Sequence, residues 1–459
     1  MRSLIGDRQF YKKVLMIAVP IMIQNGITNL VNLLDNIMVG QIGTEQMSGV
    51  AIANQLIFIF NLCIFGAVAG AGILGAQFYG NGNHEGMKYT LRFKILSGAV
   101  LAAVFTGILL LKGDALIQMF LHQGESEGNL EATLLYGMEY LKIMVLGLLP
   151  FALTQSYSGT LRETGQTVVP MTAGITAVLV NLVFNYILIF GKLGAPALGV
   201  TGAAIATVLS RFVEFAAVAV WTHKNAETNL FIRGALRSFY IPAPLVKQFL
   251  VVGLPLFINE VLWSCGMTFM NQCYSVRGLE VVAALNIAMT ISNLFNVVFL
   301  SLGNSVGIII GQLLGAGQLE QAKKEDRQII AFSVFCCFIT GSMMIVVSPF
   351  FPLLYNTEEL VKSLATTMIL FAGCCQPIFG FVHSTYFTLR AGGKSVVTFL
   401  FDSAFMWAVS IPIVFVLSRF TLVPVQIVYL MAQLSELIKC AIGFVLVKKG
   451  AWIKNIVDE

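Results

Sequence analysis

The chain has 459 residues, of which 57% are hydrophobic and only 11% are charged. Such a small number of charged side chains cannot cover the surface of a soluble globular protein, so the composition excludes that class and predicts a polytopic membrane protein. The net charge of +5 has a topological cause, given below, and we expect no nucleic-acid partner.

Twelve apolar segments follow one another along the chain, and each is long enough to cross a bilayer as a helix, which takes about 20 residues. In chain order they are 14–38, 48–79, 90–111, 130–156, 167–190, 198–221, 246–275, 281–313, 327–348, 360–389, 395–417 and 424–447. Backbone groups inside a bilayer must be satisfied within each segment, and these runs are too apolar and too long for barrel strands. The predicted fold class is therefore an all-α polytopic membrane protein with twelve transmembrane helices.

Basic residues gather in alternate loops, which predicts the orientation. With a cytoplasmic N-terminus, about 21 Lys and Arg residues fall in the predicted inside segments and 5 in the outside loops. This asymmetry follows the positive-inside rule. We therefore expect a multi-pass protein of the cytoplasmic membrane with both termini in the cytoplasm.

The second half of the sequence repeats the first. At a constant offset of 235 residues, the matched pairs include Pro20/Pro255, Gln77/Gln312, Gly80/Gly315, Gly82/Gly317 and Lys88/Lys323. At an offset of 228, LRETGQTVV (161–169) matches LRAGGKSVV (389–397). Each copy holds six helices, an even number, so the copies enter the membrane from the same side and are related by a pseudo-two-fold axis along its normal.

The repeat predicts three parts: an N-lobe over 1–222, a cytoplasmic linker over 223–245 and a C-lobe over 246–459. Secondary transporters bind their cargo near the midplane at such a repeat interface, so we expect a cleft between the lobes.

Two acids inside the apolar segments have no basic residue within a helical turn, namely Asp35 and Glu260. A carboxylate at membrane depth costs at least about 2.5 kcal/mol, so its presence needs a reason. Without a fixed cation, such an acid takes up a proton or binds a mobile cation, which makes both residues candidates for ion coupling. The alternative is a protonated carboxyl group that is hydrogen-bonded between helices.

The other intramembrane acids favour simpler explanations. Basic residues three positions away predict structural ion pairs for Glu139, Glu214 and Glu436. Asp402 lies near the predicted cytoplasmic end of its helix, and its role stays open.

Asn181 and Asn185 lie four positions apart in segment 167–190, so both amides share one helix face. Together with Asp35 they could ligate Na⁺, a hard cation that prefers oxygen ligands, or hold a protonated carboxyl. The alternative is hydrogen bonding between helices, which is common for membrane asparagines. The first segment adds further amides, Gln24, Asn25, Asn29 and Asn32.

Motifs for catalysis are missing from the sequence. There is no Walker A motif, no H-E-x-x-H motif and no nucleophile elbow in a convincing context. We therefore expect neither an enzyme nor a pump driven directly by ATP.

Several stretches, taken in order, resemble the multidrug and toxic compound extrusion (MATE) family. They are VPIMIQNGITNLVNLLDNIMVGQIG, GAQFYGNGN, LRETGQTVVPM, GVTGAAIATVLS and LPLFINEVLW. The resemblance covers the whole chain. It implies two six-helix lobes around a central cleft and exchange of organic cations for Na⁺ or H⁺.

The resemblance also implies roles for particular residues. Asp35 matches the helix 1 acid of the family's N-lobe cation site, Asn181 matches a helix 5 amide of that site, and Glu260 matches the helix 7 acid of a C-lobe site. Two positions depart from the pattern. Asn185 stands where many members have an aspartate, and segment 360–389 lacks the helix 10 aspartate that often pairs with the C-lobe glutamate.

These observations predict a monomeric antiporter that exports organic cations in exchange for H⁺ or Na⁺ by rocking of two lobes. Asp35, Asn181 and Asn185 form the predicted coupling site, and they are metal ligands only if the ion is Na⁺; no other cofactor is expected. Glu260 is the predicted substrate or second cation site. The alternative is a flippase for a lipid-linked precursor, which would need basic residues along the cleft.

Overall fold

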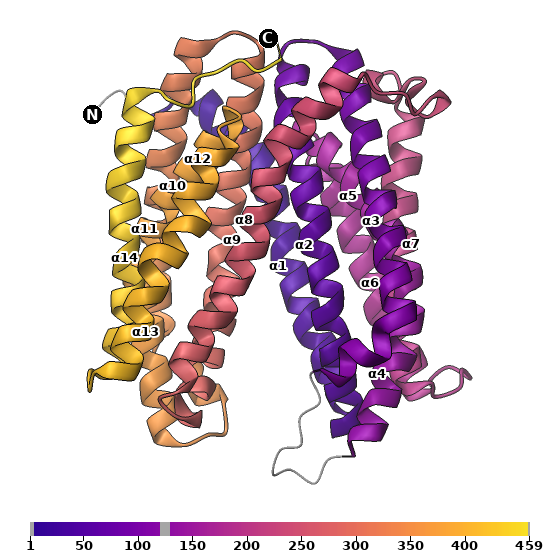
Figure 1. The fold of residues 1–459 in the computed structure, drawn as a ribbon, viewed down its shortest axis with the longest axis vertical. Coiled ribbons are helices and arrows are strands. Elements are labelled where there is room, and N and C mark those ends of the chain that lie inside the picture. Colours follow the sequence, from indigo (N-terminus) through magenta and orange to yellow (C-terminus); the bar gives the residue numbers. More distant parts are fainter. Residues whose placement is uncertain (1–3, 120–128, 458–459) are drawn as a thin grey trace. The chain divides into compact units, whose positions relative to one another are not determined.

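The computed structural model describes residues 4–119 and 129–457, and its long elements are helices (Figure 1). The helices of the first half are α1 (Arg8–Gly40), α2 (Thr44–Gly80), α3 (His84–Gln118), α4 (Leu130–Met144), α5 (Leu148–Glu163), α6 (Val168–Phe190) and α7 (Gly199–Lys224). Those of the second half are α8 (Ala243–Ser275), α9 (Leu279–Gly315), α10 (Leu319–Val347), α11 (Glu359–Ala391), α12 (Ser395–Phe399), α13 (Ile411–Phe420) and α14 (Val425–Lys449).

Twelve helical spans within the described residues are long and apolar enough to cross a membrane, and each coincides with one predicted segment. The predicted fold class is therefore confirmed. Large apolar side chains point outward from these spans, such as Leu111 and Phe335, which are 78% and 60% exposed. In a bilayer such side chains face lipid, which is as apolar as they are.

Two of the twelve spans are interrupted. The fourth consists of α4, the 3₁₀ turn η2 (Val145–Gly147) and α5. Pro150 is the third residue of α5 and has no N–H to donate to the carbonyl of Leu146, so the regular series of α-helical hydrogen bonds is broken there. The eleventh span contains two π-helical turns, η6 (Leu400–Ala404) and η7 (Met406–Ser410), between α12 and α13.

Residue contacts divide the chain into two compact units. The N-unit comprises Ile23–Gly75 and His84–Leu250, and the C-unit comprises Met1–Met22, Ala76–Asn83 and Val251–Glu459. Helices α1, α2 and α8 therefore each contribute residues to both units. The predicted lobe boundaries at 222/223 and 245/246 stay predictions.

Each unit has its own apolar core. Phe60, Leu141 and Leu148 are fully buried in the N-unit cluster. The C-unit has two clusters, one around the first turns of α1 and the second half of α9, and the other where α8, α9 and α11 pack near α14. Residues 4–7 before α1 and residues 450–457 after α14 lie at the same end of the C-unit (Figure 1).

The repeat is visible where the last turn of α2 meets the last turn of α9 inside the C-unit. A Cβ atom on Gly80 would collide with the backbone carbonyl of Gln312, and one on Gly315 would collide with the backbone carbonyl of Gln77. The contacts are reciprocal because these residues are paired by the offset of 235. Only glycine allows the two backbones to approach this closely.

Candidate functional site

The structure brings Asp35, Asn181 and Asn185 together inside the N-unit. Nδ2 of Asn185 donates a hydrogen bond to Oδ1 of Asp35 at 2.7 Å and lies 3.1 Å from Oδ1 of Asn181. The two asparagines are 5% and 2% exposed. They lie on the buried stripe of α6, which also contains Ala177 and Ile189, because residues three or four positions apart share a helix face.

Asn181 can present either end of its amide to the carboxylate. In one orientation its nitrogen donates to Thr207 Oγ1 at 3.2 Å. Turned by 180°, the same nitrogen donates to both carboxylate oxygens of Asp35 at 3.0 Å, and the amide oxygen accepts from Thr207. An amide in this position therefore offers a donor to an ionised carboxylate and an acceptor to a protonated one.

The site extends to residues that sequence reasoning missed. Thr207 on α7 contacts Asn181, and Tyr140 on α4 bonds to both Thr207 and Asn54. A threonine or tyrosine in an apolar span is common and carries no signal by itself. Only the packing of α4, α6 and α7 in the N-unit marks these hydroxyls as part of the cluster.

Asp35 has no cationic partner in the part of the chain that the structure describes. Two buried acids differ: Glu163 is bonded to Lys94 at 2.5 Å, and Glu325 to Lys13 at 3.1 Å. The ligand set around Asp35 is one carboxylate, two amides and one hydroxyl, all of which carry oxygen atoms. This set fits a proton or a small hard cation.

Among the described residues, Gln24, another amide of the first helix, bonds to a guanidinium and not to Asp35. Oε1 of Gln24 accepts a hydrogen bond from Arg162 at 2.7 Å, which fixes this guanidinium within the N-unit. Glu214 lies in the electrostatic field of Arg162 and Arg211, but the predicted ion pair with Arg211 is not found among the described residues. The side chain of Asn32 lies outside the described residues.

Glu260 belongs to the C-unit and has a different environment. The Tyr386 hydroxyl donates to its Oε1 at 3.4 Å, and the Arg390 guanidinium acts on it electrostatically. The neighbouring Asn259 is 1% exposed and donates to Asp402 Oδ2 at 3.0 Å. A cation therefore already acts on Glu260, unlike Asp35.

Asp402 is part of a buried ion cluster. Lys439 lies 3.3 Å from Asp402 and 3.2 Å from Glu436. The predicted pair of Glu436 and Lys439 is therefore present, and Asp402 joins it from the π-helical part of its span. Extra-wide turns of this kind re-aim side chains, and here the turn contains the acid that meets Lys439.

Comparisons with known proteins agree with this fold. The chain is 25% identical over 416 residues to a probable multidrug resistance protein NorM of Thermotoga maritima, covering 89% of this chain and 86% of the relative. It superposes with a TM-score of 0.87 and 20% identity on the outward-facing conformation of a multidrug resistance MATE family transporter of the MOP superfamily, covering 98% of both chains. It is also similar in fold to a MOP superfamily transporter from Pyrococcus furiosus, whose pocket is described as reversed in polarity, with a TM-score of 0.85, 20% identity, and coverage of 99% and 98%.

A family model supplies the assignment. The MatE model matches residues 20–187 and 255–416, one match in each half of the repeat. The chain therefore belongs to the MatE family, and is a multi-pass multidrug efflux transporter of the MATE type and not an enzyme.

Proposed function

We propose that this protein is an antiporter that exports organic cations in exchange for H⁺ or Na⁺, with Asp35 as the coupling carboxylate. One observation carries the proposal: Asp35 is bonded by neighbouring amides and has no ion pair among the described residues. A carboxylate kept at this depth without a fixed cation can exist in two charge states. That is the property a coupling site needs.

The neighbouring amides can hydrogen-bond to the carboxyl group of Asp35 in both its ionised and its protonated state. When Asp35 is ionised, Asn185 and the turned Asn181 donate hydrogen bonds to it. When a proton binds, the carboxyl O–H becomes a donor, and the Asn181 oxygen can accept from it. A bound Na⁺ would likewise be met by the carboxylate and by amide oxygens.

Helix α1 connects this chemistry to movement. It contains Pro20, which cannot donate to the carbonyl of Met16, so the helix can bend there at low cost. The boundary between the units falls between Met22 and Ile23, two residues later. Neutralising Asp35 removes a costly buried charge and favours a different packing of this half of α1, which would expel the cargo.

The names of the relatives and the charge pattern support this cargo and this setting. Relatives are named multidrug resistance proteins, and an acidic intramembrane site suits cationic drugs. Basic loops support a cytoplasmic membrane location with both termini inside. We expect a monomer, because each chain carries its own complete Asp35 cluster.

Glu260 is proposed as a second cation or substrate site. Its carboxylate accepts a hydrogen bond from Tyr386 and lies in the electrostatic field of the Arg390 guanidinium. Uptake of a coupling ion there would have to compete with that guanidinium. This competition favours Asp35 as the coupling residue.

A flippase for a lipid-linked precursor is the second candidate. It would need free basic residues along the transport path to hold a pyrophosphate. Lys94 and Lys439 are both held by buried acids, and Arg211 acts on Glu214. The transporter of reversed pocket polarity has the same fold, so charge in the site, rather than fold, distinguishes the two.

Dye efflux from proteoliposomes tests the proposal. Ethidium efflux is measured with an imposed H⁺ or Na⁺ gradient for the unmodified chain, Asp35→Asn and Glu260→Gln. Glu139→Gln is the control, since Glu139 is an exposed acid on α4 of the same unit. We expect Asp35→Asn to abolish gradient-driven efflux and the control to retain it. Loss with Glu260→Gln alone would move coupling to the C-unit, and no gradient-driven movement of any cationic dye would favour the flippase.

A further inference from the structure

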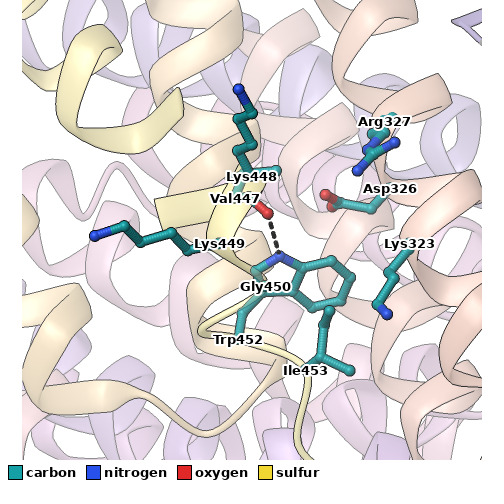
Figure 2. Close-up of a pocket in the computed structure, with 9 residues that line it drawn as sticks. All are labelled: Lys323, Asp326, Arg327, Val447, Lys448, Lys449, Gly450, Trp452 and Ile453. Carbon is teal, nitrogen blue, oxygen red and sulfur yellow. Dashed lines mark hydrogen bonds between the residues drawn. The ribbon is translucent and has the colours of Figure 1, made fainter. Parts of the chain in front are cut away.

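A basic pocket lies at one end of the C-unit, and none of its lining residues belongs to the Glu260 or Asp402 cluster. Figure 2 shows it between the first turns of α10 and the tail that follows α14. Its volume is about 370 Å³, within the range of roughly 300–1,000 Å³ typical of small-molecule sites. The lining residues are Lys323, Asp326, Arg327, Val447, Lys448, Lys449, Gly450, Trp452 and Ile453.

The charges of this pocket favour an anion. Four of its side chains are basic and one is acidic. Of the four, Lys323 is bound by Glu320 at 2.6 Å on its own helix. Arg327 is exposed and, within the described residues, makes no hydrogen bond or ion pair. Its guanidinium acts electrostatically on Asp326.

Asp326 supplies a second and independent sign of a ligand. Its side chain is 0% exposed, and Oδ1 accepts a hydrogen bond from Thr388 at 2.5 Å. Oδ2 has no hydrogen-bond partner among the described residues. Figure 2 shows the carboxylate pointing from α10 toward the tail, beside Arg327. An unsatisfied buried acceptor is costly, so the pocket calls for a donor as well as an anion.

The internal repeat shows what the pocket lacks. Arg92 occupies the position of Arg327 in the first copy, at the offset of 235. There it donates three hydrogen bonds, to the carbonyls of Gly234, Ala235 and Tyr240 in the linker after α7. The tail after α14 gives Arg327 no such acceptors among the described residues. Oxygen acceptors from a separate molecule would complete the second copy.

We propose that this pocket binds the phosphoglycerol head group of an anionic phospholipid, of the phosphatidylglycerol type. Phosphate oxygens accept from Arg327 and Lys448, and a glycerol hydroxyl donates to Oδ2 of Asp326. The pocket lies where two apolar spans end, at the depth of lipid head groups, and basic pockets of this kind bind such groups.

Native mass spectrometry and thermal unfolding of the purified full chain test the proposal. Phosphatidylglycerol and phosphatidylcholine are compared for the unmodified chain, Arg327→Gln and Lys448→Gln. Lys324→Gln is the matched control, because Lys324 is exposed on the same helix but does not line the pocket. Loss of a charged hydrogen bond predicts roughly tenfold weaker phosphatidylglycerol binding in both pocket variants and little change in the control.

Three outcomes would overturn the proposal. They are equal binding of phosphatidylcholine, equal losses in Lys324→Gln and the pocket variants, and equal protection by soluble glycerol phosphate, which would assign the pocket to a free phosphate compound. Because no transport is measured, these outcomes are independent of the antiporter test.

Discussion

At the scale of single residues, the chain treats its intramembrane acids in two ways. Glu163 and Asp402 are bonded to lysines, whereas the partners of Asp35 within the described residues are neutral groups. The sequence was enough to distinguish Asp35 from Glu436, because Glu436 has a basic residue three positions away and Asp35 has none within a helical turn. It could not find the partners that come from other helices, such as Lys439 for Asp402.

Asn185→Asp tests how charge sets ion affinity at the Asp35 site. The new carboxylate would lie within hydrogen-bond distance of Asp35, and two such groups cannot both stay ionised without a cation between them. We expect the concentration of coupling ion at half-maximal efflux to fall by roughly tenfold or more. Asn54→Asp is the control, because Asn54 accepts a hydrogen bond from Tyr140 and, within the described residues, makes none to Asp35. An unchanged ion dependence in Asn185→Asp would remove Asn185 from the coupling site.

Lys439→Met tests the buried ion cluster. This variant leaves Asp402 and Glu436 without their cation, and removing one member of a buried pair typically costs about 3–5 kcal/mol. Asp402→Asn should cost less, because Glu436 still pairs with Lys439. Thermal unfolding of the purified variants measures both effects. Equal stability losses would mean that Asp402 is the only partner that matters.

At the scale of elements, the packing of α2 against α9 rests on two glycines that the repeat pairs. Gly80 and Gly315 each face a backbone carbonyl of the opposite helix. The offset of 235 marked both positions in the sequence. It did not reveal that the two helix ends touch each other, because repeat matching compares positions and carries no information on contact.

Gly80→Ala tests this crossing. The added methyl group would meet backbone that cannot move independently, so we expect a loss of about 1–3 kcal/mol in stability. Gly107→Ala on α3 is the control, since the space that its added methyl group would occupy has no atom within 4 Å, and alanine favours a helix by up to about 1 kcal/mol. Thermal unfolding measures both effects. A lower melting temperature for Gly107→Ala than for Gly80→Ala would contradict the close approach of the two backbones.

The interrupted spans show the limit of pattern reading at this scale. The sequence predicts continuous helices over segments 130–156 and 395–417. Hydropathy indicates which residues are surrounded by lipid, but it carries no information on the hydrogen-bond pattern of the backbone. Pro150 accounts for the break between α4 and α5 only once the turn is seen. The π-helical turns beside Asp402 have no such marker in the sequence.

At the scale of the whole molecule, the distribution of basic residues predicts how the chain is oriented across the membrane, whereas the fold by itself does not. We expect the loop between α6 and α7 to face outside and the end of α7 to face inside. Leu193→Cys should then react with a membrane-impermeant maleimide in intact cells, and Lys224→Cys should not; both side chains are exposed. The unmodified chain controls for its eight native cysteines. Reversed labelling would reverse the orientation.

The amino-acid sequence alone was enough to predict the number of spans, the repeat and the residue types of the candidate site. Hydropathy, repeat offset and the spacing of charges are all properties of the order of residues along the chain. It also placed Asn181 and Asn185 on one face of a helix. The three-dimensional arrangement was needed to show that this face meets Asp35, that Thr207 and Tyr140 join it, and that Asp402 is held by Lys439. The same is true of the basic pocket around Asp326. These features depend on contacts between helices distant in sequence, and such contacts are set by packing, which no local pattern records.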